Sequence, residues 1–161
     1  MKRIAVLVIA ASFLVIFAGT ATAQTTETDI FGIEIGQVTG YNFGTEEIGV
    51  GQLMGLHFGM TDAMELGFVF VQGDAADMPD FSLVRMTYFL QEEFGFQLST
   101  GSSGATNVAG GLGVFTSPIR REFNDTLTTS LRLSFDYLVP QMQTSVSDGI
   151  ASLTISGKIS F

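Results

Sequence analysis

From residue 31 onward, apolar residues alternate with small or polar residues at a period of two, and no stretch shows a 3.6-residue repeat of any length. Alternation of this kind predicts β-strands with two different faces. Turn-forming residues interrupt the pattern at regular intervals, so the chain is expected to form about eight strands. The predicted strands span residues 31–38, 48–60, 64–72, 81–90, 94–100, 108–116, 127–137 and 150–161.

The two faces of these strands differ in a way that indicates which one faces inward. Met54, Leu56 and Phe58 are typical of the apolar face, whereas the opposite face holds mostly Gly, Ser and Thr. A water-facing surface usually carries about 25–35% charged residues, but only 14% of this chain is charged and 46% is hydrophobic. Small polar residues suit the narrow lumen of a small barrel, and the apolar face suits lipid. The sequence therefore predicts an all-β protein, an antiparallel up-and-down transmembrane β-barrel of about eight strands.

The connections between the predicted strands fall into two sets. Residues 61–63, 91–93 and 117–125 are expected to form turns at one end of the barrel. The opposite end would carry four loops, at residues 39–47, 73–80, 101–107 and 138–149. In bacterial barrels, turns of the first kind face the periplasm and the loops face outward.

Six charged residues fall on the predicted lumen face, three acidic and three basic. They are Glu34, Glu65, Arg85, Arg132, Asp136 and Lys158. Because an unpaired buried charge is costly, these side chains are expected to form a lumen charge network. Glu34 and Lys158 would lie on the first and last strands, which become neighbours when the barrel closes, so they form the best candidate pair. The only histidine, His57, shares this face and is interpreted as structural.

Aromatic residues cluster near the predicted strand ends, as in the two interfacial girdles of membrane barrels. Phe31, Tyr88, Phe94 and Phe161 would form one girdle, and Tyr41, Phe43 and Tyr137 the other.

The first 23 residues have the pattern of a secretory signal peptide. Lys2 and Arg3 precede an apolar run over residues 4–18, and Ala21-Thr22-Ala23 is an A-x-A cleavage site. The predicted organisation is therefore a signal peptide at 1–23 and a barrel at 24–161. The alternative is a retained anchor, since residues 4–23 are long enough to span a bilayer of about 20 residues.

Several classes of function are not supported by the sequence. The chain lacks Cys, so it offers neither a disulfide framework nor a thiolate metal site, and its net charge of −9 argues against binding nucleic acid. No phosphate-binding loop, dinucleotide fingerprint, zinc-protease or nucleophile-elbow motif is present. We therefore expect no catalytic residues, no cofactor, no metal site and no enzyme activity.

The predicted outer loops are acidic and contain no Lys or Arg. Their carboxylates are Glu46, Glu47, Asp74, Asp77, Asp80 and Asp148. Such loops could bind divalent cations, although solvated acidic loops are the simpler interpretation.

The carboxyl end reads Gly157-Lys158-Ile159-Ser160-Phe161, with apolar residues alternating behind a final aromatic. It resembles the C-terminal sorting signal of bacterial outer-membrane proteins, in which Gly157, Ile159 and Phe161 would be the matching residues. The segment 58–67 resembles a strand-turn-strand unit common in these proteins. Residues 24–161 as a whole resemble the small eight-stranded outer-membrane barrels, the family of OmpX and the OmpA transmembrane domain. This resemblance implies an outer-membrane location, lipid as the surrounding partner, and the barrel assembly machinery as a partner during biogenesis.

Four functions are compatible with these features. A structural or surface-interaction barrel with a packed polar lumen is favoured, because a narrow packed lumen cannot support general diffusion. The alternatives are a narrow channel for small apolar molecules, a lipid-modifying enzyme that would need a His-Ser-acid cluster, and a soluble periplasmic lipocalin-like lipid binder.

Overall fold

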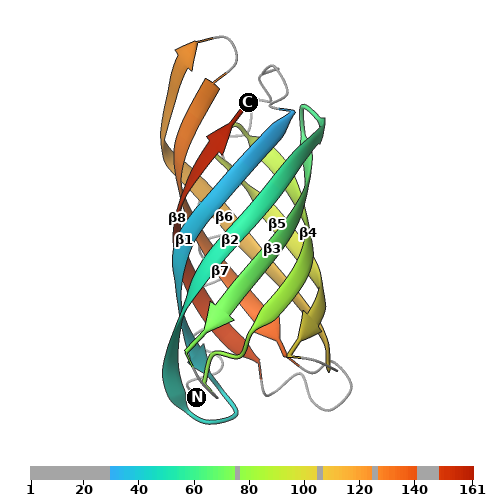
Figure 1. Cartoon of the computed structure of the whole chain (residues 1–161), viewed down its shortest axis with the longest axis vertical. Helices are drawn as coiled ribbons and strands as arrows, with labels where there is room; N and C mark the ends of the chain where they lie inside the picture. The colour runs from blue at the N-terminus through green and yellow to red at the C-terminus, as the bar shows by residue number, and fades with distance from the viewer. Residues whose placement is uncertain (1–29, 75–76, 105–106, 125–126, 141–148) are drawn as a thin grey trace.

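The computed structural model of this chain describes residues 30–74, 77–104, 107–124, 127–140 and 149–161 (Figure 1). The predicted signal peptide at 1–23 lies outside these residues. The described part forms eight strands, all at positions close to those predicted from the sequence: β1 (Phe31–Asn42), β2 (Glu47–Thr61), β3 (Met64–Gly73), β4 (Phe81–Gln91), β5 (Phe94–Ser103), β6 (Asn107–Asn124), β7 (Leu127–Val139) and β8 (Ile150–Ser160).

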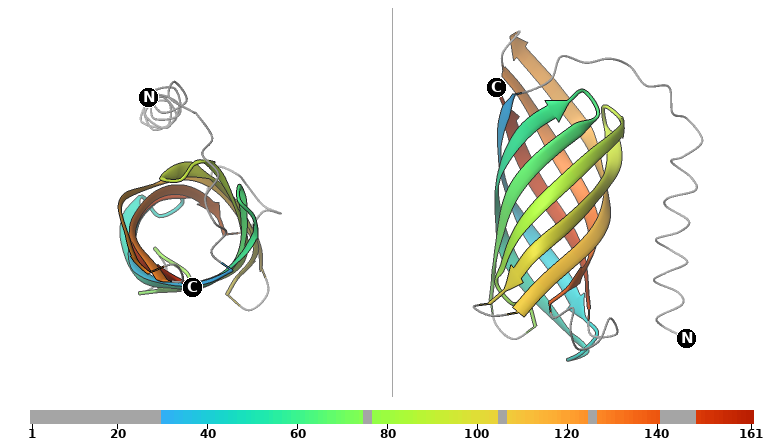
Figure 2. Two further views of the ribbon diagram at one scale, coloured as in Figure 1. Left: turned by 90° about the horizontal axis from the view of Figure 1, so that it is seen from above. Right: turned by 90° about the vertical axis from the view of Figure 1, so that its right-hand side faces the viewer.

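Each strand pairs antiparallel with the next along the chain, and β8 pairs with β1 to close the barrel. Figure 2 shows the strands as one continuous wall around a central axis. Closure leaves no open sheet edge along the paired strands, so their backbone polar groups bond to one another. The predicted fold class, a closed eight-stranded antiparallel barrel, is confirmed. Among the described residues, no helix is long and apolar enough to cross a membrane.

The wall of the barrel is inverted relative to a water-soluble protein. Large apolar side chains point outward, with Ile35 62% and Met54 61% exposed, while Glu34 and Arg132 are almost completely buried inside. The alternation that the sequence predicted holds along β2, where Leu53 and His57 point inward between the outward Met54, Leu56 and Phe58. A soluble domain buries its large apolar residues and exposes its charges, so this surface suits an apolar surrounding.

Strand β6 is longer than the sequence predicted, and the turn expected at residues 117–125 is wrong. The strand continues to Asn124, although its pairing with β5 stops at Thr116. Beyond this point it pairs only with β7, with a register shift between Thr116 and Ile119. The two strands rise together past the neighbouring wall at one end of the barrel (Figure 1). Pro118 cannot donate a backbone hydrogen bond to a neighbouring strand, so its presence favoured a turn. Proline is nevertheless tolerated at strand edges and bulges, and here it lies at the register shift.

The lumen is less polar than the sequence predicted. The lumen is polar towards the turn end, but an apolar cluster fills the half nearest the loops. Its members are Val38, Leu53, Val69, Val71, Met78, Phe81, Leu83, Ala109, Leu138 and Ile150. Most of these residues lie at the loop ends of their strands, where the alternation places apolar residues on both faces. Removing them from water stabilises the loop end without any polar partner.

Met78, in the connection between β3 and β4, fills the mouth of this apolar half. Its side chain is fully buried, and it lies where three glycines provide space. A methyl group added to Gly40, Gly49 or Gly73 would lie within 2.7 Å of a Met78 atom. The absence of side chains at these positions therefore lets the connection fold back into the barrel, and the position of Met78 could not be read from the alternation.

Aromatic residues gather at both ends of the outer wall, with one exception. At the turn end, the rings of Phe31 and Phe161 lie 6.3 Å apart. At the loop end, the ring of Phe43 lies 5.1 Å from Tyr41 and 6.2 Å from Tyr137.

The exception is Phe94, which was expected in the turn-end girdle but is only 6% exposed. A register shift between Phe89 and Gln91 lies opposite Phe94 and interrupts the alternation at the start of β5.

Replacing a methionine with alanine should destabilise the barrel more in the apolar half of the lumen than on its outer face. Met78→Ala should lower the free energy of unfolding by about 2–3 kcal/mol, because it leaves a cavity in a packed interior. Met86→Ala, on the outer face of β4, should cost less than about 1 kcal/mol. Urea unfolding of the refolded barrel in lipid vesicles measures both, and equal losses would contradict the role of Met78.

Candidate functional site

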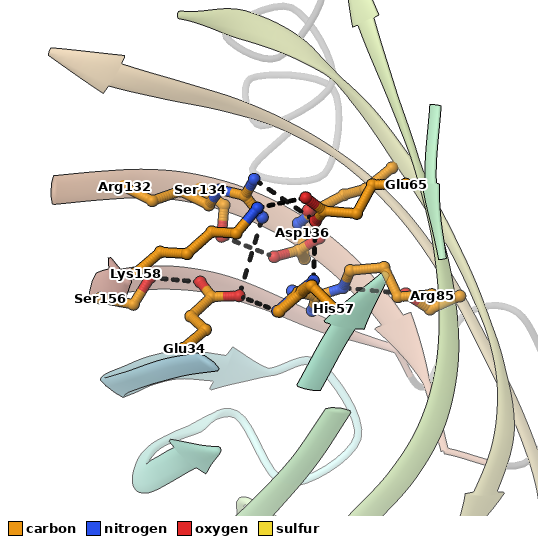
Figure 3. Close-up of polar contacts among 11 residues, drawn as sticks. Glu34, His57, Glu65, Arg85, Arg132, Ser134, Asp136, Ser156 and Lys158 are labelled. Atoms are coloured by element: carbon orange, nitrogen blue, oxygen red, sulfur yellow. Dashed lines mark hydrogen bonds and ion pairs between the residues drawn. The ribbon is translucent and has the colours of Figure 1, made fainter. Parts of the chain in front are cut away.

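Seven charged or titratable side chains meet inside the barrel, in the half towards the turns (Figure 3). They come from β1, β2, β3, β4, β7 and β8, and each is at most 6% exposed: Glu34, His57, Glu65, Arg85, Arg132, Asp136 and Lys158. We call these residues the lumen cluster. Six of them are the residues that the sequence predicted for a lumen charge network, and the structure brings them into one region.

His57 lies at the centre of the cluster, between two glutamates. Its Nε2 is 2.8 Å from Glu34 Oε2, and its Nδ1 is 2.7 Å from Glu65 Oε1. The ring therefore lies within contact distance of a carboxylate oxygen on each side. An imidazolium carries a proton on each nitrogen and complements both carboxylates, whereas a neutral ring would turn a lone pair towards one of them.

Two glycines provide the space for this ring. A methyl group added to Gly55 would lie 2.7 Å from His57 Nε2, and one added to Gly67 would lie 2.8 Å from His57 Nδ1. Gly67 is the direct cross-strand partner of His57 on β3. The imidazole therefore occupies the space that side chains at positions 55 and 67 would otherwise fill.

Cations from β7 and β8 complete the surroundings of the two glutamates. The Arg132 guanidinium is 3.7 Å from Glu34 and 3.8 Å from Glu65, and it lies 4.5 Å above the ring of Phe115. Lys158 Nζ donates to Glu65 Oε2, and the Ser156 hydroxyl donates to Glu34 Oε1. Each carboxylate thus faces several donors, which is how a buried charge is tolerated.

The pairing of Glu34 with Lys158 that the sequence favoured needs correction. The two residues are cross-strand neighbours in the β1–β8 ladder, as expected. However, the ammonium group of Lys158 forms its ion pair with Glu65 on β3. The lumen is narrow enough for a long lysine side chain to reach across it, so register alone could not identify the ionic partner.

Asp136 and Arg85 occupy the part of the cluster nearer the loops. Asp136 accepts hydrogen bonds from Gln97 Nε2 at 2.6 Å and from the Ser134 hydroxyl at 3.1 Å. Arg85 donates from Nε to the Ser99 hydroxyl at 3.4 Å. Here neutral side chains on β5 and β7 carry the polar contacts, and Gln97 and Ser134 were not identified as site residues from the sequence.

The geometry of the cluster suits a rigid interior better than catalysis. Both nitrogens of His57 face carboxylates and the residue is only 1% exposed. A general base needs a free nitrogen within reach of a substrate proton. Among the residues that the structure describes, no group of three or more potential ligands could hold a metal ion.

The predicted sorting-signal residues lie on the outer face of β8. Phe161 is 50% exposed, Ile159 is exposed beside it, and a methyl group added to Gly157 would meet no atom within 4 Å. Phe161 exchanges backbone hydrogen bonds with Phe31, at 3.2 and 2.7 Å. The end of the chain therefore lies in the seam where β1 and β8 close the barrel.

The acidic loop residues that the structure describes are partly engaged with backbone groups. Asp80 Oδ1 accepts from the Gly73 N–H at 3.0 Å, and Asp74 Oδ1 accepts from the Val50 N–H at 3.4 Å. Asp148 lies outside the described residues. Cation binding by these loops stays a prediction.

Comparison with known proteins assigns the chain to no family. No protein-family model matches the chain, and no curated protein matches it. One similar solved structure comes from work entitled "De novo design of transmembrane beta-barrels", with a TM-score of 0.48, 11% identity, and coverage of 86% of this chain and 100% of the other. Another is Ail, the attachment invasion locus protein of Yersinia pestis, solved in complex with the heparin analogue sucrose octasulfate. Its TM-score is 0.45 at 12% identity, with 81% of this chain and 97% of Ail covered.

The ion pair between Glu65 and Lys158 inside the lumen predicts strong coupling. Glu65→Leu should lower the free energy of unfolding by about 3–5 kcal/mol, because it leaves the buried ammonium group of Lys158 without its partner. The double change Glu65→Leu and Lys158→Leu should be less destabilising than Glu65→Leu alone, since it removes both members of the pair. Urea titration of the refolded barrels tests this, and additive losses would contradict it.

Adding a methyl group to a glycine should lower the stability of the barrel beside His57 but not at an open position. Gly67→Ala should destabilise the barrel by about 1–3 kcal/mol, because the ring it meets is held on both sides. Gly157→Ala meets open space and should change stability by less than about 0.5 kcal/mol. The same unfolding measurement compares the two variants, and equal effects would show that the ring can move freely.

Proposed function

We propose that this protein is an integral outer-membrane β-barrel with a structural or surface-interaction role and no catalytic activity. The observation that carries the proposal is the inverted wall, with exposed Ile35, Met54 and Phe70 outside and buried Glu34 and Arg132 inside. A barrel of eight strands is just wide enough for side chains to fill its interior, as they do here. Any specific recognition would then belong to the loops, which lie on a rigid scaffold.

The interior supports a closed barrel rather than a channel. The lumen cluster fills the turn half, while the apolar cluster and Met78 fill the loop half. A conduit for small apolar molecules would need the displacement of packed side chains from both layers. The lipocalin-like alternative needs an apolar interior around a ligand, and the charged residues at the centre of this lumen argue against it.

The location and export of the protein belong to the same proposal. A signal peptide at residues 1–23 would direct the chain out of the cytoplasm. The exposed aromatic end of β8, from Gly157 to Phe161, would then be available to the barrel assembly machinery before the seam closes. Outer-membrane lipid would cover the wall between the two groups of aromatic residues.

Fluorescence provides a direct test, because the chain contains no Trp. In vesicles, Phe70→Trp on the outer face of β3 should be quenched strongly by lipids brominated on their acyl chains. Thr45→Trp, in the exposed turn between β1 and β2, should instead be quenched by iodide in the water. Iodide quenching of both variants, without quenching by brominated lipid, would reject the membrane assignment.

A further inference from the structure

Three glutamine side chains form a row on the outer face of the barrel. Gln37 on β1 pairs in register with Gln52 on β2, and Gln52 pairs with Gln72 on β3. All three side chains are exposed. None makes a hydrogen bond with another described residue. We call Gln37, Gln52 and Gln72 the amide row.

At Gln52, the middle residue of the amide row, the apolar wall is interrupted and then continues towards the loops. Towards the turns the row is followed by Ile35, Met54 and Phe70, which are 53–62% exposed. Towards the loops the outward residues are apolar again on β2, where Val50 is 48% and Ile48 69% exposed. Gln52 therefore has apolar neighbours on both sides along the outer face, whereas Thr39 follows Gln37 and Asp74 follows Gln72 towards the loops.

The surface is hollowed on both sides of this row. One hollow of about 490 Å³ lies over β1, β2 and β3, and its lining includes all three glutamines. A second, of about 600 Å³, lies over β8, β1 and β2, and its lining includes Gln37, Gln52 and Thr39 beside Leu153 and Ile155. The amides thus border recesses that another molecule can fill.

An amide without a partner is unfavourable in such surroundings. Leaving a polar group unsatisfied in an apolar medium costs several kcal/mol, because no water is present to replace the lost hydrogen bonds. Each glutamine amide has donors and an acceptor. A surface of amides is therefore complementary to a second copy of itself, and a two-fold interface brings the same patch together from both subunits.

The charges around the row favour a second copy over a lipid headgroup. A phosphate group would be recognised by Arg or Lys. In the strands that line the two hollows, the one such residue is Lys158, which is buried in the lumen, while Asp74 borders the hollow at the loop end. An uncharged, self-complementary partner suits this surface better than an anionic one.

We propose that the amide row is the contact surface of a homodimer in the membrane, with Gln52 closest to the two-fold axis. Hydrogen bonds between the amides of the two copies would replace those that lipid cannot supply, as polar side chains do between membrane helices. The apolar residues around the row would pack against their symmetry mates. This inference rests on the proposed function, because the amides are unsatisfied only if the wall faces lipid.

The test compares the wild-type chain with the triple variant Gln37→Leu, Gln52→Leu and Gln72→Leu in vesicles at low protein density. Energy transfer between two dye-labelled populations should report dimers for the wild type, and at least a tenfold loss of association for the triple variant. The matched control is Thr100→Leu, which also replaces an exposed polar residue with leucine but lies on β5. It should associate like the wild type.

Cross-linking gives a second measurement that does not depend on the triple variant folding. The chain has no Cys, so Thr39→Cys beside the row would be the only thiol, and oxidation should give a covalent dimer. A Cys placed at Thr100 should not cross-link.

Two results would overturn the proposal. One is a wild type that stays monomeric at all protein densities and does not cross-link through Thr39→Cys. The other is a monomer that retains a bound lipid through these glutamines, which would assign the row to a lipid. Failure of the proposed function would be seen separately, as a Phe70→Trp variant that brominated lipid does not quench.

Discussion

Hydrocarbon offers no hydrogen bonds, and this constraint accounts for most features of the barrel. Backbone groups are satisfied because each strand pairs with its neighbours and β8 closes onto β1. Charged side chains are directed inward, where Glu34, Glu65 and their cationic partners satisfy one another. The outer wall is left mostly with apolar residues, and at the amide row the constraint is not met within one copy of the chain.

The interior divides the barrel into two layers with different sources of stability. The lumen cluster depends on mutual neutralisation around His57, so the loss of one member leaves others unpaired. The apolar layer depends on close packing around Met78, so the stability lost on a substitution there increases with the volume of the cavity that it leaves. A packed interior of this kind gives the loops a rigid support, and it is consistent with a scaffold whose function lies at its surface.

Much of the fold could be predicted from the sequence, because alternation with a period of two predicts where the strands lie and which residues share a face. The eight strands follow from that pattern, and the inward position of the charged residues follows from the small polar residues on their face and the low charge of the chain. The pattern failed where a side chain or segment departs from local alternation: at Pro118, where a strand continues past a residue typical of turns, and at Phe94, opposite a register shift.

The candidate site was predictable in its members and not in its contacts. The alternation placed Glu34, Glu65 and Lys158 in the lumen. The ionic partner of Lys158, however, depends on distances across the barrel, which the pairing of neighbouring strands does not determine. His57 was assigned to the lumen face without a role in the charge network. The glycines at positions 55 and 67, which provide space for its ring, were a signal that could have suggested it.

The apolar wall of the closed barrel should lie in a membrane. The most direct measurement is fractionation of a bacterial envelope that expresses the chain with residues 1–23, followed by gel electrophoresis with and without boiling. We expect a protein that partitions with the outer membrane, needs detergent for extraction, and migrates differently before and after boiling. A soluble periplasmic protein with no change in migration would contradict it.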